Sequence, residues 1–324
     1  MRDRSRSVQV TMGDVLVRRA APPKPEVGGP MGNEPGEHPT MRAPSSARVS
    51  TTMADVYQRE GFVFLENLFS AGEVETVRAA ALAAGAQESE RRVFESDGVT
   101  VRSVYGIHEH DGRFAALARH PRLVDAARRI LGGDVYVYQS KLNAKAALGG
   151  DLWPWHQDYI FWRNEDAMPA PRAVTAAVFV DDVTELNGPI ALVPGSHKGG
   201  VLPYDTWNGE LAGYGTSPAW MANLVARLKY TIQREALLGV ALAHGVVTPK
   251  AKAGSVLLFD CNIAHASAMN LSPYPRTVAL FTYNRVDNAP DIKALHRPEF
   301  LVSRDSQPIE VVADDALRLA GAPA

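Results

Sequence analysis

The chain has 324 residues, of which 46% are hydrophobic and 22% charged, and its formal net charge is -2. This composition is that of an ordinary globular protein, and the near-neutral charge excludes the strongly basic surface that nucleic-acid binding requires. The single cysteine, Cys261, excludes an internal disulfide and a cysteine-rich zinc site.

No stretch of the chain approaches about 18 consecutive apolar residues, so we expect no membrane-spanning helix and no membrane partner. The first residues also lack the apolar segment of a signal peptide. Together with the lone cysteine, these features favour a cytoplasmic protein, and we expect a monomer or a homodimer.

Residues 1–52 differ in composition from the rest of the chain. They are rich in proline, glycine, serine and charged residues, as in "RAAPPKPEVGGPMGNEPGEHPT". Such a segment buries too little apolar surface to offset the entropy lost on ordering, so we expect it to be disordered. The folded domain is therefore predicted to span residues 53–324.

Helices dominate the first part of this domain. An amphipathic helix is expected from residue 53, followed by a short strand in "GFVFLENLF". Residues 71–87 are strong helix formers, and residues 120–133 form a third helix that Gly132 and Gly133 end. Residues 134–145, "DVYVYQSKLNAK", alternate in polarity and are rich in Val and Tyr, which predicts a strand.

Short strand-like runs then recur between turn residues. They read "WPWHQDYIFW", "RAVTAAVFVDDV", "GPIALVPGSH", "GSVLLFD" and "RTVALFTYNRV". Many short strands of this kind are typical of a sandwich or barrel, not of alternating βαβ units. A helical insert is expected between residues 214 and 243. The predicted fold is mainly β with helices (α+β): a double-stranded β-helix, the jelly-roll of cupin-like proteins, with supporting N-terminal helices.

The run "WPWHQD" contains the first candidate site. Residues two apart on a strand point to the same face, so His156 and Asp158 would present an imidazole and a carboxylate together, while Gln157 faces away. By itself a His-x-Asp pair is a weak signal.

A second histidine strengthens it. His265 follows the strand-like run "GSVLLFD", and two histidines with one carboxylate form the facial triad of non-haem Fe(II) enzymes. Three coordination positions then stay open, two for a chelating co-substrate and one for O2. Arg276, on the following strand, could bind the far carboxylate of 2-oxoglutarate through two parallel hydrogen bonds.

Each of these residues also has a plain structural interpretation. A lone histidine is more often a satisfied core residue, and a lone arginine more often forms a surface ion pair. His197, in "PGSHKGG", is interpreted as a loop residue. The remaining histidines are not at ligand spacing with a partner: His108, His110, His120, His244 and His296. The hypothesis therefore depends on the ordered set of four residues, each on a predicted strand.

These residues and their surroundings resemble a known family. The motifs "QSKLNAKAALGGDLWPWHQDYIFWRNEDAMPAPRAV", "ELNGPIALVPGSHK", "GSVLLFDCNIAHASAMNLSP" and "RTVALFTYN" are similar to those of the phytanoyl-CoA dioxygenase superfamily of Fe(II)/2-oxoglutarate oxygenases. Within it, the chain looks most like the bacterial branch with ectoine hydroxylases and free-leucine hydroxylases. The resemblance covers roughly residues 54–307.

The resemblance implies a role for each matching position. It implies that His156, Asp158 and His265 bind iron and act in catalysis. It further implies that 2-oxoglutarate contacts Arg276, Ser267, Asn143 and Trp153, although Trp153 can face the site only if the strand bends locally. The expected substrate contacts are Gln139, Trp162, Arg163, Arg102, Tyr105 and His108, with Arg102 as a partner for a substrate carboxylate.

Three functions are compared on this basis. The first is hydroxylation of a small free amino acid or related zwitterion in natural-product or compatible-solute biosynthesis. The second is the same chemistry on a larger natural-product scaffold, and the third is a non-catalytic metal-binding jelly-roll, which has no need of the Arg276 clamp. Halogenases of the superfamily lack the metal carboxylate, so Asp158 favours hydroxylation, with desaturation and epoxidation left open. The substrate, the carbon oxidised and the stereochemistry cannot be read from the sequence.

Overall fold

The computed structural model describes residues 7–8, 17–18, 52–208, 220–221, 224–225 and 227–321. The segment predicted to be disordered, residues 1–52, lies outside these ranges except for Thr52 and two short paired strands, β1 (Ser7–Val8) and β2 (Val17–Arg18). None of the described helices is both long enough and apolar enough to traverse a bilayer.

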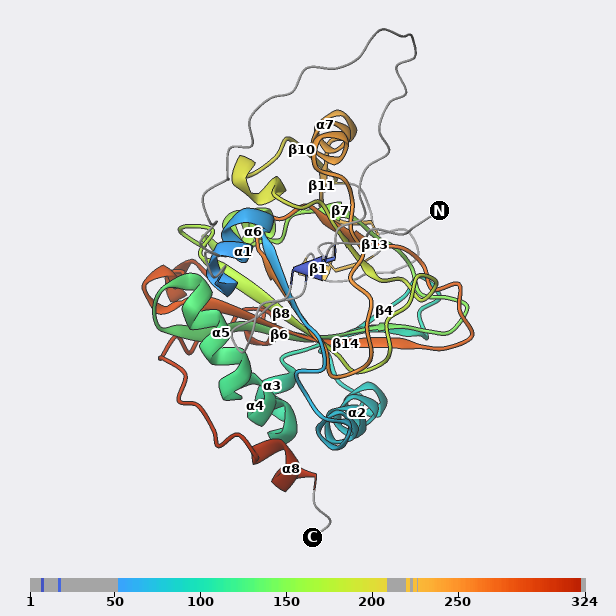
Figure 1. The fold of residues 1–324 in the computed structure, drawn as a ribbon, viewed down its shortest axis with the longest axis vertical. Coiled ribbons are helices and arrows are strands. Elements are labelled where there is room, and N and C mark those ends of the chain that lie inside the picture. The colour runs from blue at the N-terminus through green and yellow to red at the C-terminus, as the bar shows by residue number, and fades with distance from the viewer. Residues whose placement is uncertain are drawn as a thin grey trace, which may run out of the picture.

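Two antiparallel sheets form the centre of the molecule (Figure 1). The larger sheet has the strand order β3 (Phe62–Leu65), β12 (Val256–Asp260), β8 (Ala173–Phe179), β14 (Arg276–Arg285), β6 (Val135–Lys145), β5 (Val101–Tyr105) and β4 (Arg92–Phe94). The smaller has the order β7 (Trp153–His156), β13 (His265–Ser267) and β9 (Ile190–Leu192). The predicted mainly β, jelly-roll architecture with helices is confirmed.

Strand periodicity separates two cores. In β12, Val256 and Leu258 belong to the cluster that packs against the helices, while Leu257 and Phe259 belong to a second cluster that also contains Leu192 of β9. Alternate residues of one strand thus face the helices and the smaller sheet in turn. The space between the sheets is where inward-facing polar residues meet.

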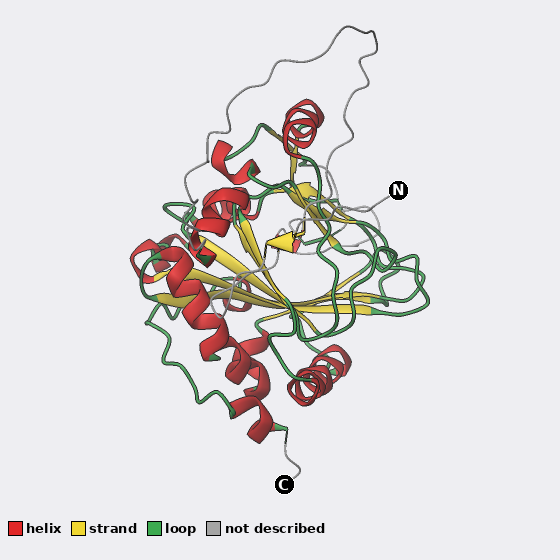
Figure 2. Ribbon diagram, viewed as in Figure 1, coloured by secondary structure: helices red, strands yellow, loops and turns green. Residues whose placement is uncertain are grey.

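Helices cover the outer face of the larger sheet (Figure 2). They are α1 (Met53–Glu60), α2 (Ala71–Ala86), α3 (Ile107–His110), α4 (Gly112–Ala118), α5 (Pro121–Leu131) and α8 (Ala316–Ala320). Short 3-10 turns lie at η1 (Ser196–Gly199), η3 (Val286–Asn288), η4 (Ile292–Ala294) and η5 (Glu299–Leu301). The helices predicted over 71–87 and 120–133 are confirmed, and Gly132, in the left-handed conformation, ends α5 as expected.

Two predictions of secondary structure are wrong. "WPWHQDYIFW" is a strand only as far as His156, because α6 (Asp158–Asp166) begins directly after it. Aromatic and β-branched residues suggested a strand, but Tyr159, Ile160, Phe161 and Trp162 are all buried around the first turn of a helix, so tertiary packing overrides local preference. Of the helical insert predicted over 214–243, residues 214–219, 222–223 and 226 lie outside the described residues. The remainder contains the strand β11 (Tyr230–Ile232), which pairs with β10 (Tyr204–Thr206), and the helix, α7 (Arg234–His244), starts only after that strand.

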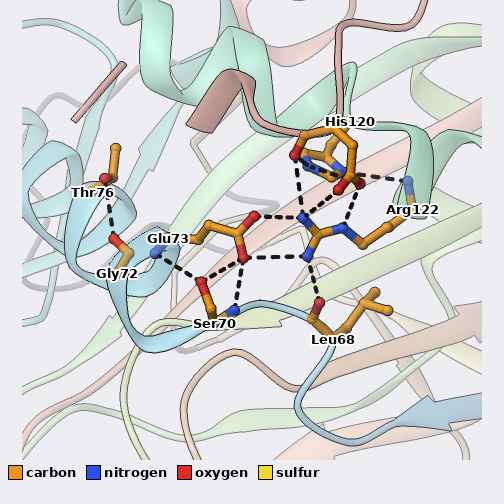
Figure 3. A network of polar contacts seen from close by, with 8 residues as sticks. Leu68, Ser70, Gly72, Glu73, Thr76, His120 and Arg122 are labelled. Carbon is orange, nitrogen blue, oxygen red and sulfur yellow. Dashed lines mark hydrogen bonds and ion pairs between the residues drawn. The ribbon is translucent and has the colours of Figure 1, made fainter. Parts of the chain in front are cut away.

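A buried ion pair ties the helical layer together (Figure 3). Glu73 closes a capping box with Ser70 at the start of α2, and Arg122 of α5 donates hydrogen bonds to Glu73 and to the Leu68 carbonyl. The Arg122 guanidinium also lies 4.8 Å from the centre of the Phe69 ring. Burial raises the pKa of Glu73, but the hydrogen bonds from Arg122 and Ser70 outweigh it and bring the pKa to about 2.

Replacing Glu73 with glutamine should lower the free energy of unfolding at pH 7 by about 1.5–3 kcal/mol, the contribution of a hydrogen bond to a charged group. Because the folded-state pKa is depressed, the stability from Glu73 is complete above its unfolded-state pKa and is lost as pH falls towards 2. Urea unfolding between pH 7 and 2 should therefore show a smaller loss of stability for Glu73→Gln than for the wild type. Equal losses would contradict the pairing.

Candidate active site

Alternate residues of β6 line one face of the space between the sheets. Gln139, Lys141 and Asn143 all border the cavities described below, and Lys145 continues the same row. Lys145 lies directly opposite Arg276 on β14. The period of two therefore brings a row of amide and ammonium groups inside the barrel.

Three potential metal ligands meet next to this row. The candidate ligand atoms of His156, Asp158 and His265 all lie within 4.8 Å of one another. The two Nε2 atoms, of His156 and His265, are 3.7 and 3.9 Å from the Asp158 carboxylate oxygens. His156 and His265 are paired across β7 and β13, but Asp158 comes from the first turn of α6. The three residues lie together as expected, but the predicted geometry is wrong, since the strand ends before Asp158.

Hydrogen bonds fix the orientation of both imidazoles. Nδ1 of His156 lies 2.6 Å from the Pro154 carbonyl, and Nδ1 of His265 lies 3.1 Å from the Ile263 carbonyl. A carbonyl oxygen can only accept, so Nδ1 carries the proton and Nε2 keeps its lone pair towards Asp158. Burial lowers the pKa of both histidines, that of His156 to about 3, which keeps the rings neutral. Two neutral imidazoles and one carboxylate fit a divalent metal with open positions.

Gln157 faces away from this cluster, as predicted, and anchors the loop that carries it. Its amide donates to the carbonyls of Gly200 and Asn262, and its carbonyl accepts from the Leu202 amide. The strand-to-helix turn between His156 and Asp158 is therefore held by buried hydrogen bonds.

The first cavity extends from the three ligands to Arg276. It spans about 410 Å³, including space open to solvent, and is lined by Lys141, Asn143, Trp153, His156, Asp158, Ile190, Phe259, His265, Ala266, Ser267, Arg276 and Leu280. Arg276 is buried and donates to the Gly188 carbonyl at 2.8 Å, yet among the described residues neither its Nε nor Ser267 Oγ has a hydrogen-bond partner. A buried polar atom without a hydrogen-bond partner destabilises the fold. A polar ligand bound in this cavity would supply the partners of both atoms.

Positive charge is concentrated at the Arg276 end of this cavity. Burial, Arg276 and Arg102 lower the pKa of Lys145 to about 7, and burial lowers the pKa of Arg276 to about 10. No carboxylate forms an ion pair with either side chain among the residues that the structure describes. This end of the cavity therefore suits an anion.

A second cavity opens on the other side of the ligands. It spans about 360 Å³, including space open to solvent, and is lined by Tyr105, Gln139, Lys141, Trp153, His156, Asp158, Phe161, Trp162, Leu224, Leu228 and Arg297. Both cavities share Lys141, Trp153, His156 and Asp158. Two of the three candidate ligands, His156 and Asp158, thus stand where the two cavities meet, so groups bound in either cavity would be next to a metal held by the triad.

Trp153 reaches both cavities because β7 is irregular. His265 pairs with His156 and Ser267 pairs with Trp153, so three steps along β7 match two steps along β13. The extra residue is a β-bulge that rotates Trp153 to the side of His156. This bulge supplies the local bend that a site-facing Trp153 requires.

Three predicted substrate contacts do not line either cavity. Arg102 is fully buried behind Trp153 and is ion-paired with Glu95, so the structure does not support a direct contact with a substrate carboxylate. His108 bonds to Ser140 Oγ at 2.7 Å, and Arg163 is exposed on α6 and bonds to Asn164. Helix α6 turns Arg163 outward, whereas the predicted strand left it at the pocket rim.

Two charged residues at the cavities were missed. Lys141 borders both cavities, and Arg297 borders the second while pairing with Asp166. The period of two that selects Gln139 and Asn143 also selects Lys141, so this signal was present in "QSKLNAK". Arg297 follows the last strand in a loop, and no pattern in the sequence marks it.

Comparisons with known proteins agree with this arrangement. The family model "Phytanoyl-CoA dioxygenase (PhyH)" matches residues 57–278. The chain is 40% identical to L-proline trans-4-hydroxylase of Streptomyces griseoviridis over 261 residues, which is 81% of this chain and 95% of that protein. It is 37% identical to the ectoine dioxygenase of Sphingopyxis alaskensis over 249 residues, which is 75% of this chain and 78% of that protein.

Solved structures give the same picture. EctD from S. alaskensis with 2-oxoglutarate and 5-hydroxyectoine matches with a TM-score of 0.67 and 34% identity, covering 84% of this chain and 89% of that one. The epimerase SnoN from nogalamycin biosynthesis, bound to Fe3+, alpha ketoglutarate and nogalamycin RO, has a TM-score of 0.55 and 22% identity, covering 81% and 93%, so it shares the fold alone. From the family match and the two relatives, the chain belongs to the phytanoyl-CoA dioxygenase family.

Proposed function

We propose that this protein is an Fe(II)- and 2-oxoglutarate-dependent dioxygenase that hydroxylates an unactivated C–H bond of a small free amino acid or amino-acid-like zwitterion. One observation carries the proposal: the triad borders a cavity that contains a buried arginine with no ion pair among the described residues, and two of its members, His156 and Asp158, also border a second, aromatic cavity. The two curated relatives bear the names of enzymes acting on proline and on ectoine, both small zwitterions.

In this proposal His156, Asp158 and His265 hold the iron. With 2-oxoglutarate and O2, the iron supplies the oxidising power for hydroxylation, and succinate and CO2 are the co-products. Arg276 binds the far carboxylate of 2-oxoglutarate through its free Nε and one Nη, helped by Ser267 Oγ. A buried guanidinium orients the co-substrate so that its other end reaches the iron.

Two further residues border the co-substrate. Asn143 already accepts a hydrogen bond from Ser103 Oγ at 3.1 Å, which leaves its amide N–H groups available to 2-oxoglutarate. Trp153 would exclude water beside it and separate it from the substrate.

The second cavity would hold the substrate. Trp162, Phe161 and Tyr105 give it aromatic walls that exclude water, and Gln139 donates to the Leu301 carbonyl at 2.7 Å, so its own amide oxygen is available to a substrate donor. Leu224 and Leu228 give an apolar side against which a carbon skeleton can pack.

Lys141 is the cation best placed for the substrate carboxylate. Its ammonium lies 5.8 Å from the centre of the Tyr105 ring and 5.7 Å from that of Trp153, and it has no ion pair among the described residues. The other cation at the cavity, Arg297, is already engaged by Asp166.

Replacing Lys141 with methionine should raise the KM for the amino-acid substrate by about 30-fold or more, because a desolvated charge partner contributes about 2 kcal/mol or more. The methionine keeps the aliphatic packing against Trp153. Steady-state kinetics with each reactant varied in turn would test this, with Lys229→Met, which removes a lysine paired with Glu165, as the control. A KM that rises only for 2-oxoglutarate would assign Lys141 to the co-substrate instead.

The proposal is tested by measuring succinate release from 2-oxoglutarate with Fe(II), ascorbate and air. The panel should contain L-proline, other free amino acids, ectoine and no substrate. Substrate-stimulated turnover with a small zwitterion, and a product heavier by one oxygen atom, would support it. If no member of the panel raises turnover, the small-zwitterion proposal fails in favour of the same chemistry on a larger scaffold.

Beyond the small-molecule substrate, we propose no nucleic-acid or membrane partner, since the formal net charge of -2 provides no field for either. Whether the enzyme is a monomer or a homodimer would be measured by light scattering in the same preparation.

A further inference from the structure

Arg102 is buried behind Trp153, which lines both cavities, and borders neither cavity itself. It lies on β5, where Phe94 pairs with Val101 and Val93 pairs with Ser103, so Arg102 is the extra residue of a β-bulge. Bulges of this kind re-aim a side chain and are frequent next to active sites. Here the long cationic side chain next to the bulge reaches Trp153, a residue that both cavities share.

The guanidinium of Arg102 contacts two segments of the chain that line the cavities. Its centre lies 3.8 Å from the middle of the Trp153 ring, and its Nη2 donates to the Leu152 carbonyl at 3.0 Å. Its Nε donates to the carbonyl of Leu224, 122 residues further along the chain, at 3.2 Å. Trp153 lines both cavities, and Leu224 lines the proposed substrate cavity.

Glu95 keeps this guanidinium in place. Its Oε2 accepts from Arg102 Nη1 at 2.9 Å, and the same Nη1 reaches the Asp151 carbonyl at 3.2 Å. Four of the five N–H donors of Arg102 are thus engaged by a carboxylate and three carbonyls, and the side chain borders neither cavity, so it is not placed to bind a substrate carboxylate. The planar guanidinium of arginine can donate hydrogen bonds in several directions at once, which a single ammonium cannot reproduce.

We propose that Arg102 is a positioning residue that fixes Trp153 and Leu224 relative to each other, and so couples the oxidation of 2-oxoglutarate to the oxidation of the substrate. This inference rests on the proposed function. In the coupled reaction, 2-oxoglutarate, O2 and R–H give succinate, CO2 and R–OH. When the substrate C–H bond is misplaced, the second oxygen atom is instead reduced to water by two electrons from ascorbate and two protons, and succinate forms without product.

The consequence can be measured as the ratio of succinate to hydroxylated product. Arg102→Met should raise this ratio at least about threefold, since a misplacement of about 1 Å can cost up to about 10²-fold in rate. Arg102→Lys, which retains the charge opposite Glu95, should fold like the wild type and raise the ratio by a smaller factor. The KM for 2-oxoglutarate should change less than the ratio, because Arg276 remains.

Arg122→Met is a matched control. Arg122 is likewise paired with a buried glutamate, bonded to a backbone carbonyl and packed over an aromatic ring, but in the helical layer (Figure 3). Its loss should lower Tm and leave the ratio unchanged. A ratio at the wild-type value in both Arg102 variants, with Tm lowered as in Arg122→Met, would show that Arg102 is merely structural and overturn the proposal.

Amide hydrogen exchange gives a readout that needs no turnover. Arg102→Met should speed exchange both in the peptide covering residues 151–156 and in that covering 224–230, whereas Arg122→Met should affect neither. If the wild type shows no 2-oxoglutarate turnover, the proposed function fails, yet this exchange pattern still tests whether Arg102 holds Trp153 and Leu224 in place. Unchanged exchange in residues 224–230 of Arg102→Met would overturn the positioning role of Arg102, whatever the activity of the enzyme.

Discussion

An Asp158→Ala variant is expected to lose both bound iron and 2-oxoglutarate turnover. The variant removes the one carboxylate of the triad and leaves two neutral imidazoles, His156 and His265. Changing a residue that only supports a metal ligand typically costs about 10–100-fold in affinity or activity, so removing a ligand should cost more than about 100-fold. Because Asp158 begins α6 and accepts no hydrogen bond from the residues that the structure describes, the fold should survive the change.

Metal content after dialysis, measured by mass spectrometry, would check the first part, and succinate release the second. Asp287→Ala, which removes an exposed carboxylate paired with Arg285, is the matched control and should keep wild-type iron and activity. His156→Ala should behave like Asp158→Ala. Stoichiometric iron and undiminished turnover in Asp158→Ala would remove this residue from the metal site.

The candidate metal ligands could be predicted from the sequence because their spacing carries chemical information. His156, Asp158 and His265 were selected by residue type and order, and those properties do not depend on the exact secondary structure. The reasoning from strand periodicity was nevertheless wrong for Asp158, which lies on a helix. The pairing of His156 with His265 depends on the register of β7 and β13, which only the folded sheet fixes.

The fold was predictable where local signals agree with the tertiary structure. Alternation over β6 and strong helix formers in α2 each specify one element, and the structure contains both. The aromatic segment of α6 and the β11 strand could not be predicted, because their local preferences favour other structures. In these segments burial against neighbours decides the conformation, and those neighbours are distant in sequence.

Arg102 illustrates a different limit. Its residue type suggested a partner for a substrate carboxylate, but its partners are Glu95 and three backbone carbonyls. Which backbone carbonyl a side chain will bind cannot be recognised from a sequence, since every residue has one. Lys141, in contrast, shares the face of Gln139 and Asn143 on β6, so strand periodicity alone would have found it.

The second large effect is expected at Arg276. Replacing it with methionine should raise the KM for 2-oxoglutarate by about 30-fold to 4,000-fold, since truncating one partner of a buried charge pair costs about 2–5 kcal/mol. The KM of Arg276→Lys for 2-oxoglutarate should fall between those of the wild type and Arg276→Met, because an ammonium keeps the charge but loses the bidentate hydrogen bonds. Iron content should stay at the wild-type level in both variants, since Arg276 lies at the opposite end of the cavity from the triad.

The control for Arg276 lies on the same strand. Arg285→Met removes the guanidinium at the other end of β14, where it pairs with Asp287 at the surface, and should leave the KM unchanged. Initial rates of succinate formation over a range of 2-oxoglutarate concentrations would give each KM. Because Lys145 lies opposite Arg276, a Lys145→Met variant shows whether Arg276 alone suffices to bind the far carboxylate of 2-oxoglutarate. If Arg276→Met left the KM within about twofold of the wild type while Lys145→Met raised it, the carboxylate would be bound by Lys145, and the Arg276 clamp would be wrong.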